Sequence, residues 1–260
     1  MVSRRDQSGK HVAGTRHGLA RVMSKRGLCS RSQAEAAIRA GRVTLDGRVV
    51  RDPQTPTAAD ASIAIDDVAV VPVERRYLML NKPRGTVTTA NDERGRDTVY
   101  ALFADAGLPW IAPVGRLDKA SEGLLLFSND SEWAARISAP ESQLEKTYHV
   151  QVDRLPDADL LARIQAGVRD DGEWLAARSV MELRRGEKNA WLEIVLDEGR
   201  NRQIRRLLAA LDVSVLRLIR VAIGPLQLGN LAKGQWRELD AEEVRAVMQQ
   251  QGPGSRSSPS

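Results

Sequence analysis

Apolar residues near the start of the chain recur at spacings that predict two short helices followed by a hairpin. Leu19, Val22 and Met23 lie on one helix face, and Gly27 is placed to end that helix. Residues 30–33, Ser-Arg-Ser-Gln, have the form of a capping box and predict a second helix that ends at Gly41. The alternating run 43–50 contains an Asp-Gly pair, which is typical of a hairpin turn.

The pattern changes after residue 76, where a larger core begins. Strands are predicted over 77–80, 86–89, 122–128, 145–152, 178–183, 190–197 and 213–223. Helices are predicted over 97–105, 131–138, 157–167, 201–211 and 240–250. Runs of strands mixed with helices indicate an α+β protein with a mixed, mainly antiparallel sheet flanked by helices.

Composition shifts divide the chain into four parts. A flexible basic tail is expected over 1–17, a small helix-hairpin domain over 18–74, a larger domain over 75–250 and a disordered tail over 251–260. The single cysteine, Cys29, excludes an internal disulfide and fits a reducing cytoplasm. No apolar run has membrane-spanning length, and the basic N-terminus leads into no signal sequence.

The net charge of +5 is distributed unevenly along the chain. Residues 16–51 carry nine Lys or Arg and two acids, whereas residues 52–260 sum to −4. This asymmetry indicates either a polyanion-binding module or a solvated basic surface. The residues that a helix pair and hairpin could present to phosphates are Arg21, Lys25, Arg26, Arg31, Arg39, Arg42 and Arg48. A domain used for protein contacts is the alternative.

The stretch 115–130 places one carboxylate, Asp118, beside Arg116 and ahead of an apolar strand. Gly115 permits an unusual backbone angle there, and Leu117 can anchor the loop in the core. A carboxylate at the edge of a buried strand is partly desolvated and needs a cation to stay charged. From the residues alone, a structural ion pair between Asp118 and Arg116 is favoured over a catalytic acid.

Three further segments carry candidate chemistry. Residues 197–208 predict a turn and then a helix whose first turns bear arginines, which form either an anion site or a solvated basic face. Alternation over 145–152 places Lys146 and Tyr148 on one face, where the tyrosine is either functional or an ordinary core-edge residue. In 80–85, a Pro and a Gly predict a tight turn that points Lys82 and Arg84 outward.

These segments together resemble a known family. Residues 18–74 resemble the S4 RNA-binding domain in the order helix, Gly, Ser-Arg, helix, Gly-Arg-Val and Asp-Gly turn. From Leu19 to about Val247 the chain is similar to the bacterial rRNA pseudouridine synthases of the RsuA type, which include RluB, RluE and RluF. The most specific match is Gly-Arg-Leu-Asp at 115–118, followed by Ser-x-Gly-Leu-Leu-Leu and Asn-Asp.

The resemblance implies isomerisation of a uridine to pseudouridine in rRNA, with the large subunit favoured over the small. It implies that Asp118 acts on a flipped-out nucleotide, as nucleophile or as base, and that Arg205 pairs with Asp118. Tyr148 would stack on the uracil, and Arg116 would fill the gap left by the base. The residues implied to position RNA in the larger domain are Lys82, Lys146 and Arg202.

The expected partner is ribosomal RNA or a pre-ribosomal particle. The protein is expected to be a cytoplasmic monomer that does not bind a membrane. No cofactor and no metal are expected, because the three histidines have no ligand-like spacing and Cys29 has no Cys partner. One alternative is a non-catalytic RNA-binding or ribosome-assembly protein. Another is a glycoside hydrolase that uses Asp118 and Glu122, against which the low aromatic content of 4% argues.

Overall fold

A computed structural model describes residues 16–71, 73–89 and 96–250, and the chain separates into two compact units at Glu74–Arg75. The expected tails over 1–17 and 251–260 fall outside the described residues, except for Arg16 and His17. His17 pairs with Thr57, so it belongs to the first folded unit.

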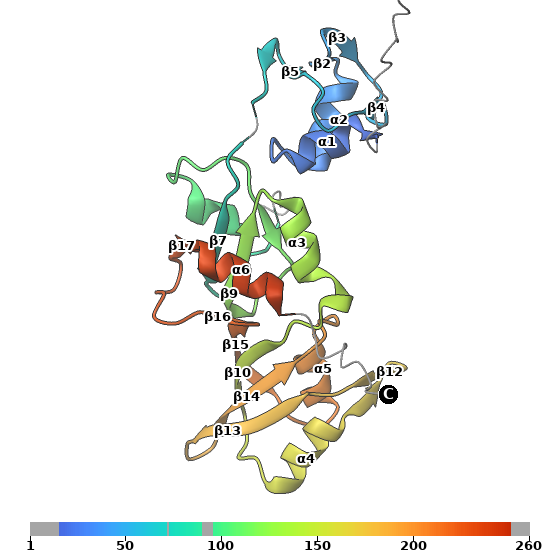
Figure 1. The fold of residues 1–260 in the computed structure, drawn as a ribbon. Helices are drawn as coiled ribbons and strands as arrows, with labels where there is room; N and C mark the ends of the chain where they lie inside the picture. Colours follow the sequence, from blue (N-terminus) through green and yellow to red (C-terminus); the bar gives the residue numbers. More distant parts are fainter. Residues whose placement is uncertain (1–15, 72, 90–95, 251–260) are drawn as a thin grey trace, which may run out of the picture. The chain divides into compact units, whose positions relative to one another are not determined.

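The described residues of the first unit form two helices and two small sheets (Figure 1). Its elements are β1 (His17–Gly18), α1 (Leu19–Lys25), α2 (Arg31–Arg39), β2 (Val43–Leu45), β3 (Arg48–Val50), β4 (Pro56–Thr57), β5 (Ile63–Ile65) and β6 (Val68–Ala69). β1 pairs with β4, and the other sheet has the order β3-β2-β5-β6.

The predicted helix pair and hairpin of this unit are confirmed. The Ser30 hydroxyl accepts from the Gln33 backbone N–H while the Gln33 side chain accepts from the Ser30 N–H, which completes the capping box. Asp46 and Gly47 both have positive φ, as a two-residue hairpin between β2 and β3 requires. The α1 residues Leu19 and Met23 are fully buried, so the apolar spacing does identify the core face.

The second unit contains a long mixed sheet with helices against it. Its elements are β7 (Tyr77–Lys82), the 3₁₀ helix η1 (Val99–Phe103), β8 (Ala112–Val114), β9 (Glu122–Ser128), α3 (Ser131–Ser138), η2 (Pro140–Ser142), β10 (Lys146–Val152), α4 (Ala158–Ala166), β11 (Val168–Asp170), β12 (Glu173–Leu175), β13 (Ser179–Arg185), β14 (Ala190–Leu196), α5 (Gln203–Ala209), β15 (Val215–Ile223), β16 (Leu226–Gln227), β17 (Trp236–Glu238) and α6 (Ala241–Gln249).

The strand order β13-β14-β10-β15-β9-β7-β17 joins two antiparallel halves through the parallel pair β9–β15 (Figure 1). α4 and α5 cover one face of β10, β14 and β15, where Ile164 and Leu207 are fully buried. α3 and α6 pack on β7 and β9 through residues such as Trp133 and Val247. The α+β architecture predicted from the sequence is confirmed.

Two predicted elements are wrong. Residues 86–89 form no strand beyond an isolated bridge between Val87 and Thr98, because the threonine hydroxyls are used in loop contacts: Thr86 donates to Pro83 O and Thr88 to Leu117 O. The helix predicted over 97–105 is a 3₁₀ turn at Val99–Phe103. The short strands β8, β16 and β17 were not predicted, since two or three residues carry no readable alternation.

Gly123, at the start of β9, allows the two halves of the sheet to meet. Its φ is +101°, and a Cβ built there would lie 2.8 Å from the backbone nitrogen of Arg220 and closer still to the Arg220 carbonyl. Only a glycine combines this backbone conformation with so close an approach to a neighbouring strand.

Gly123→Ala should therefore destabilise the protein more than Gly85→Ala does. Gly85 has the same φ of +101° but has nothing within 4 Å of its would-be Cβ. Gly85→Ala carries only the left-handed backbone penalty, about 1–2 kcal/mol, whereas Gly123→Ala adds an overpacking penalty of about 1–3 kcal/mol. Urea unfolding of both variants measures the difference, and equal losses would contradict the close-approach argument.

Candidate active site

The loop that carries Asp118 is anchored on both sides of that residue. Gly115 has a φ of +78°, and Leu117 is buried among the apolar residues of β7, β9 and η1. The Thr88 hydroxyl donates to Leu117 O at 2.8 Å, and Ser121 N–H donates to Asp118 O at 3.0 Å, which closes a turn. The backbone is held in this way while the Asp118 side chain stays 41% exposed.

The side chain of Lys82 holds the same loop through its backbone carbonyl groups. Its side chain is fully buried, and Nζ donates to Pro83 O at 3.0 Å, Asp118 O at 3.2 Å and Ser121 O at 2.9 Å. The three N–H groups of an ammonium match these three carbonyls. The prediction that Lys82 points outward toward RNA is wrong, because the residue is the last of the interior strand β7 and its side chain turns under the loop.

Burial lowers the pKa of Lys82 to about 8, and the charges of Asp118 and Glu122 oppose that drop. Lys82 is therefore mainly protonated at neutral pH, and it loses its third N–H donor as the pH rises above about 8.

A cavity of about 590 Å³ opens beside Asp118. It is lined by the 115–118 loop, the starts of α5 and β10, the segment after α3, and part of β15. Among the predicted site residues, it brings together Arg116, Asp118, Lys146, Tyr148, Arg202 and Arg205. Residues separated by almost ninety positions thus share one concave surface with a few polar groups, which is typical of a ligand site.

The Asp118 carboxylate is paired with Arg202, whose Nη1 lies 3.4 Å from Oδ2. Arg202 precedes α5 in a left-handed conformation, with φ +50°, and this placement brings its side chain to the loop. The predicted partner, Arg205, instead donates to Ala120 O at 3.1 Å and Val215 O at 3.5 Å. Arg205 lies one turn into the helix, so it reaches the loop backbone rather than the carboxylate.

The charge of Asp118 nevertheless affects the pKa of Arg205. Burial and the neighbouring Arg202 lower the pKa of Arg205, and Asp118 opposes them. The Asp118 carboxylate therefore has one directly paired arginine, Arg202, and a second, half-buried arginine close enough to interact with its charge.

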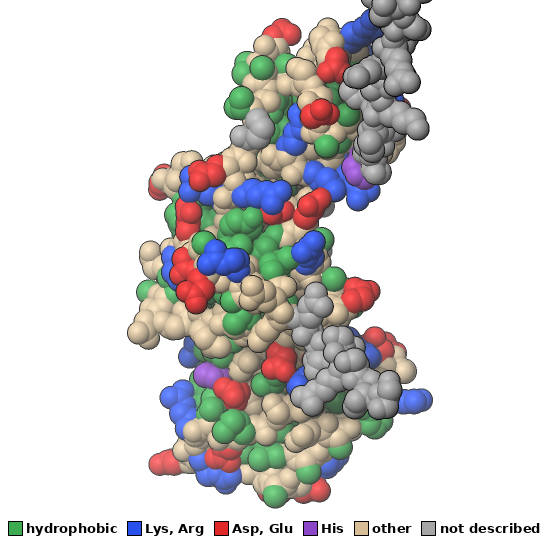
Figure 2. Space-filling model, viewed as in Figure 1, with side chains coloured by type: hydrophobic (Ala, Val, Ile, Leu, Met, Phe, Trp, Pro, Cys, Tyr) green, Lys and Arg blue, Asp and Glu red, His purple; other side chains and the backbone are tan. Residues whose placement is uncertain are grey.

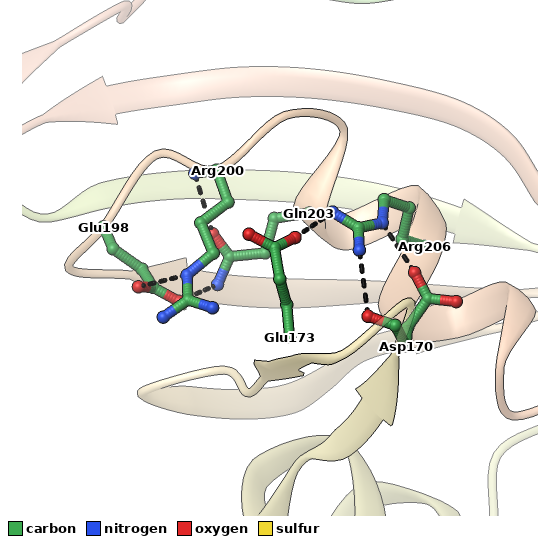
Figure 3. Close-up of polar contacts among 6 residues, drawn as sticks. All are labelled: Asp170, Glu173, Glu198, Arg200, Gln203 and Arg206. Atoms are coloured by element: carbon green, nitrogen blue, oxygen red, sulfur yellow. Dashed lines mark hydrogen bonds and ion pairs between the residues drawn. The ribbon is translucent and has the colours of Figure 1, made fainter.

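The loop that delivers Arg202 is braced by side chains (Figure 3). Gln203 is buried, and its Nε2 donates to Glu198 Oε1 at 2.6 Å, while Arg200 Nε donates to Glu198 Oε2 at 2.8 Å. Arg206 turns away from the cavity to Asp170 and Glu173, at 2.6 and 2.5 Å. Arg206 is one of the arginines predicted to project from the first turns of this helix. Its contacts anchor the helix to the β11–β12 hairpin instead.

The cavity floor comes from β10 and β15. Tyr148 lies directly opposite Arg220 in the antiparallel register, and both line the cavity. Burial and the charge of Arg220 lower the pKa of Lys146, while Asp197 opposes them. Arg220 was not predicted to belong to the site, although an arginine in the otherwise apolar run 218–223 was a readable signal of a buried charge.

The comparisons with known proteins agree with this arrangement. The family described as RNA pseudouridylate synthase matches residues 76–210, and the S4 domain matches residues 18–57. The chain is 34% identical over 232 residues to "Ribosomal large subunit pseudouridine synthase B" of Bacillus subtilis strain 168, covering 88% of this chain and 94% of that protein. It is 38% identical to the protein of the same name in Yersinia pestis, over 85% of this chain and 72% of that one.

A solved structure, "Crystal structure of pseudouridylate synthase", matches 89% of this chain and 99% of its own with a TM-score of 0.62 and 29% identity. The chain belongs to the RNA pseudouridylate synthase family. The resemblance to RsuA-type enzymes with an N-terminal S4 domain is thereby confirmed, and the protein is an enzyme.

The S4 domain uses some of its predicted RNA-binding residues for its own structure. Arg26 donates to Ala59 O and Ala61 O, and Arg42 pairs with Asp66. Arg31 lies 3.3 Å from Glu35 on the same helix, and surface ion pairs of this kind contribute little to stability. Arg21 is exposed and Lys25 is half-buried, both on α1.

Glu122 cannot serve as the opposed acid of a glycoside hydrolase. Its side chain is 3% exposed and is paired with Arg217 at 3.0 Å and Lys233 at 2.6 Å. Burial alone would raise the pKa of Glu122, but the hydrogen bonds from Arg217 and Lys233 outweigh it and hold the pKa low. Within the described residues, no three His, Cys, Asp or Glu side chains are grouped as a metal site requires, and no helix there has the length and apolarity to cross a membrane.

The pH dependence of pseudouridine formation should report the titration of Lys82. We expect the single-turnover rate to fall above pH 8, by up to roughly tenfold per pH unit, as one loop carbonyl loses its donor. Lys82→Arg should remove this inflection whatever its absolute rate, because a guanidinium keeps its charge.

Lys146→Arg is the matched control, and it should keep the inflection. An inflection that persists in Lys82→Arg and disappears in Lys146→Arg would contradict the assignment to Lys82.

Proposed function

We propose that this enzyme converts a specific uridine of ribosomal RNA, in the large subunit, to pseudouridine, and that Asp118 is its single catalytic carboxylate. The observation that carries the proposal is the Asp118 carboxylate, presented on a doubly anchored loop into a cavity that is also lined by Tyr148, Arg202 and Arg205. The preference for the large subunit is supported by the names of the Bacillus and Yersinia relatives.

The reaction needs the nucleotide to leave the helix stack, because the sugar carbon is otherwise inaccessible. The cavity of about 590 Å³ lies within the 300–1,000 Å³ range typical of small-ligand pockets, so it has room for one flipped nucleoside. Tyr148 stacks on the uracil and transfers a proton late in the reaction, and Arg116, exposed beside the cavity, fills the gap that the base leaves in the RNA.

Asp118 acts at the sugar. Either its carboxylate bonds to C1′ as the N1–C1′ bond breaks, or it removes a proton from C2′ to give a glycal. In both routes the electron pair of the N1–C1′ bond stays on the base, and the base turns. C5 then bonds to C1′ as the Asp118–C1′ bond breaks in the first route, or as the C2′ proton returns from Asp118 to C2′ in the second. C5 finally loses its proton, and N1 gains one, which gives pseudouridine. The arrangement is compatible with both routes, since the exposed Asp118 carboxylate faces the cavity beside Arg202.

The S4 domain supplies RNA affinity through exposed cations such as Arg21, while Lys146, Arg202 and Arg116 position the target strand near the cavity. On the face of the second unit shown in Figure 2, Lys and Arg side chains are interspersed with Asp and Glu. Phosphate groups would therefore be bound by individual cations and not by a large, uniformly positive surface. The substrate is rRNA or a pre-ribosomal particle, bound by a monomer in the cytoplasm.

Asp118→Asn should abolish pseudouridine formation while RNA affinity stays within about threefold, because the change removes the reacting charge but keeps the side-chain volume. Asp105→Asn, which removes an exposed acid outside the cavity, is the control and should retain full activity. Chemical mapping of pseudouridine in rRNA from a deletion strain rescued with each variant gives the readout. Normal modification by Asp118→Asn would refute the assignment of Asp118 as the catalytic carboxylate.

Arg21→Ala should weaken RNA binding and reduce the slope of log K against log salt by about 0.7–0.9, the value of one phosphate contact. Arg42→Ala should leave that slope unchanged, because Arg42 is committed to Asp66. Filter binding to an rRNA fragment between about 50 and 200 mM salt measures both slopes. A slope lowered equally by the two variants would refute the distinction.

A further inference from the structure

Arg220 holds a buried positive charge at the cavity that is only partly satisfied. Its side chain is 6% exposed on β15, and its Nε donates to Leu124 O at 2.8 Å. Within the described residues, its Nη2 is buried and has no hydrogen-bond partner. A guanidinium has donors only, so what completes this group must be an acceptor.

Buried charged donors are nearly always satisfied in folded proteins, because an unmade hydrogen bond to a charged group costs several times a neutral one. The fully buried cation Lys82 follows that rule, because its ammonium has three carbonyl acceptors. Arg220 differs in that it lines the cavity, so an incoming ligand can supply the acceptor.

The register of the sheet defines which part of a ligand meets Arg220. Tyr148 on β10 and Arg220 on β15 are directly opposite, with side chains about 5 Å apart at their base. A planar ring that stacks on Tyr148 therefore presents its edge, not its face, to the Arg220 guanidinium. The acceptors on the edge of a uracil are its two carbonyl oxygens.

We propose that the Arg220 guanidinium donates a hydrogen bond to a carbonyl oxygen of the flipped-out uracil. This inference rests on the proposed function. The base is favoured over a phosphate because Arg220 is buried, whereas Arg116 and Arg202 are exposed at the same cavity and can meet a solvated phosphate.

The contact strengthens as the reaction proceeds. When the N1–C1′ bond breaks, its electron pair stays on the base and negative charge spreads to both carbonyl oxygens. A fixed cationic donor stabilises that charge more than it stabilises the neutral base, which lowers the barrier. Arg220 is then a catalytic residue in addition to Asp118, acting on the base while Asp118 acts on the sugar.

The first test compares Arg220→Gln and Arg220→Lys with wild type in single-turnover pseudouridine formation on rRNA. We expect a rate loss of roughly a hundredfold for Arg220→Gln, a smaller loss for Arg220→Lys, and RNA affinity within about threefold of wild type. Arg217→Gln is the matched control on the same strand, because Arg217 pairs with Glu122 rather than lining the cavity, and it should stay within about threefold.

The second test is a crystal structure of the full-length Asp118→Asn protein soaked with uridine 5′-monophosphate. A base carbonyl oxygen within hydrogen-bonding distance of a terminal nitrogen of Arg220 supports the inference even if Arg220→Gln does not fold. A base bound elsewhere, or the phosphate at Arg220, overturns it. A rate for folded Arg220→Gln within threefold of wild type also overturns it, while leaving the proposed function intact.

Failure of the proposed function gives a different result, namely no pseudouridine from the wild-type enzyme on any rRNA. The soaked structure then decides the Arg220 contact by itself.

Discussion

The ammonium of Lys82 connects the end of β7 to Asp118 itself and to Ser121, where the loop leads into β9. Three backbone carbonyls converge on one buried nitrogen, so the loop cannot shift without leaving a charged donor unsatisfied. The position of the Asp118 carboxylate therefore depends on a residue that never meets the cavity. A mobile loop would hold a reactive carboxylate less accurately than this one, which is bound to a strand of the sheet on one side and to the core through Leu117 on the other.

The parallel contact between β9 and β15 has a comparable role at the scale of the domain. One antiparallel half of the sheet contributes Asp118, and the other contributes Tyr148, Arg205 and Arg220. The two halves meet at Gly123 and Arg220, where the absence of a side chain on one strand permits the backbone of the other to approach. The cavity lies where these halves join, so the residues that line it come from both.

Much of the fold followed from local pattern, whereas the pairing of side chains did not. The spacing of Leu19, Val22 and Met23 and the capping box at Ser30 are local features, and both are present as predicted. The fully buried strand at 122–128 was readable as an apolar run. Lys82 was assigned to the wrong side of its turn, because turn chemistry fixes the backbone but not the direction of a long flexible side chain.

The partner of Asp118 could not be predicted for a related reason. Arg202 and Arg205 are three residues apart on the same segment, and the left-handed conformation of Arg202 decides which one reaches the carboxylate. Arg220 is buried by strand neighbours that are distant in sequence, so its environment is a property of the assembled sheet.

The ion pair between Asp118 and Arg202 also determines what is needed to uncover the Asp118 carboxylate. Both side chains are nearly half exposed, and a pair of this kind contributes about 0–1 kcal/mol to stability, so it opens and closes readily. Exposed side chains change rotamer within nanoseconds, far faster than backbone segments rearrange. Because the Asp118 backbone is already anchored, uncovering its carboxylate requires only that Arg202 rotate toward another anion. The carboxylate is thus uncovered by an exchange of partners at one arginine, without any displacement of the loop.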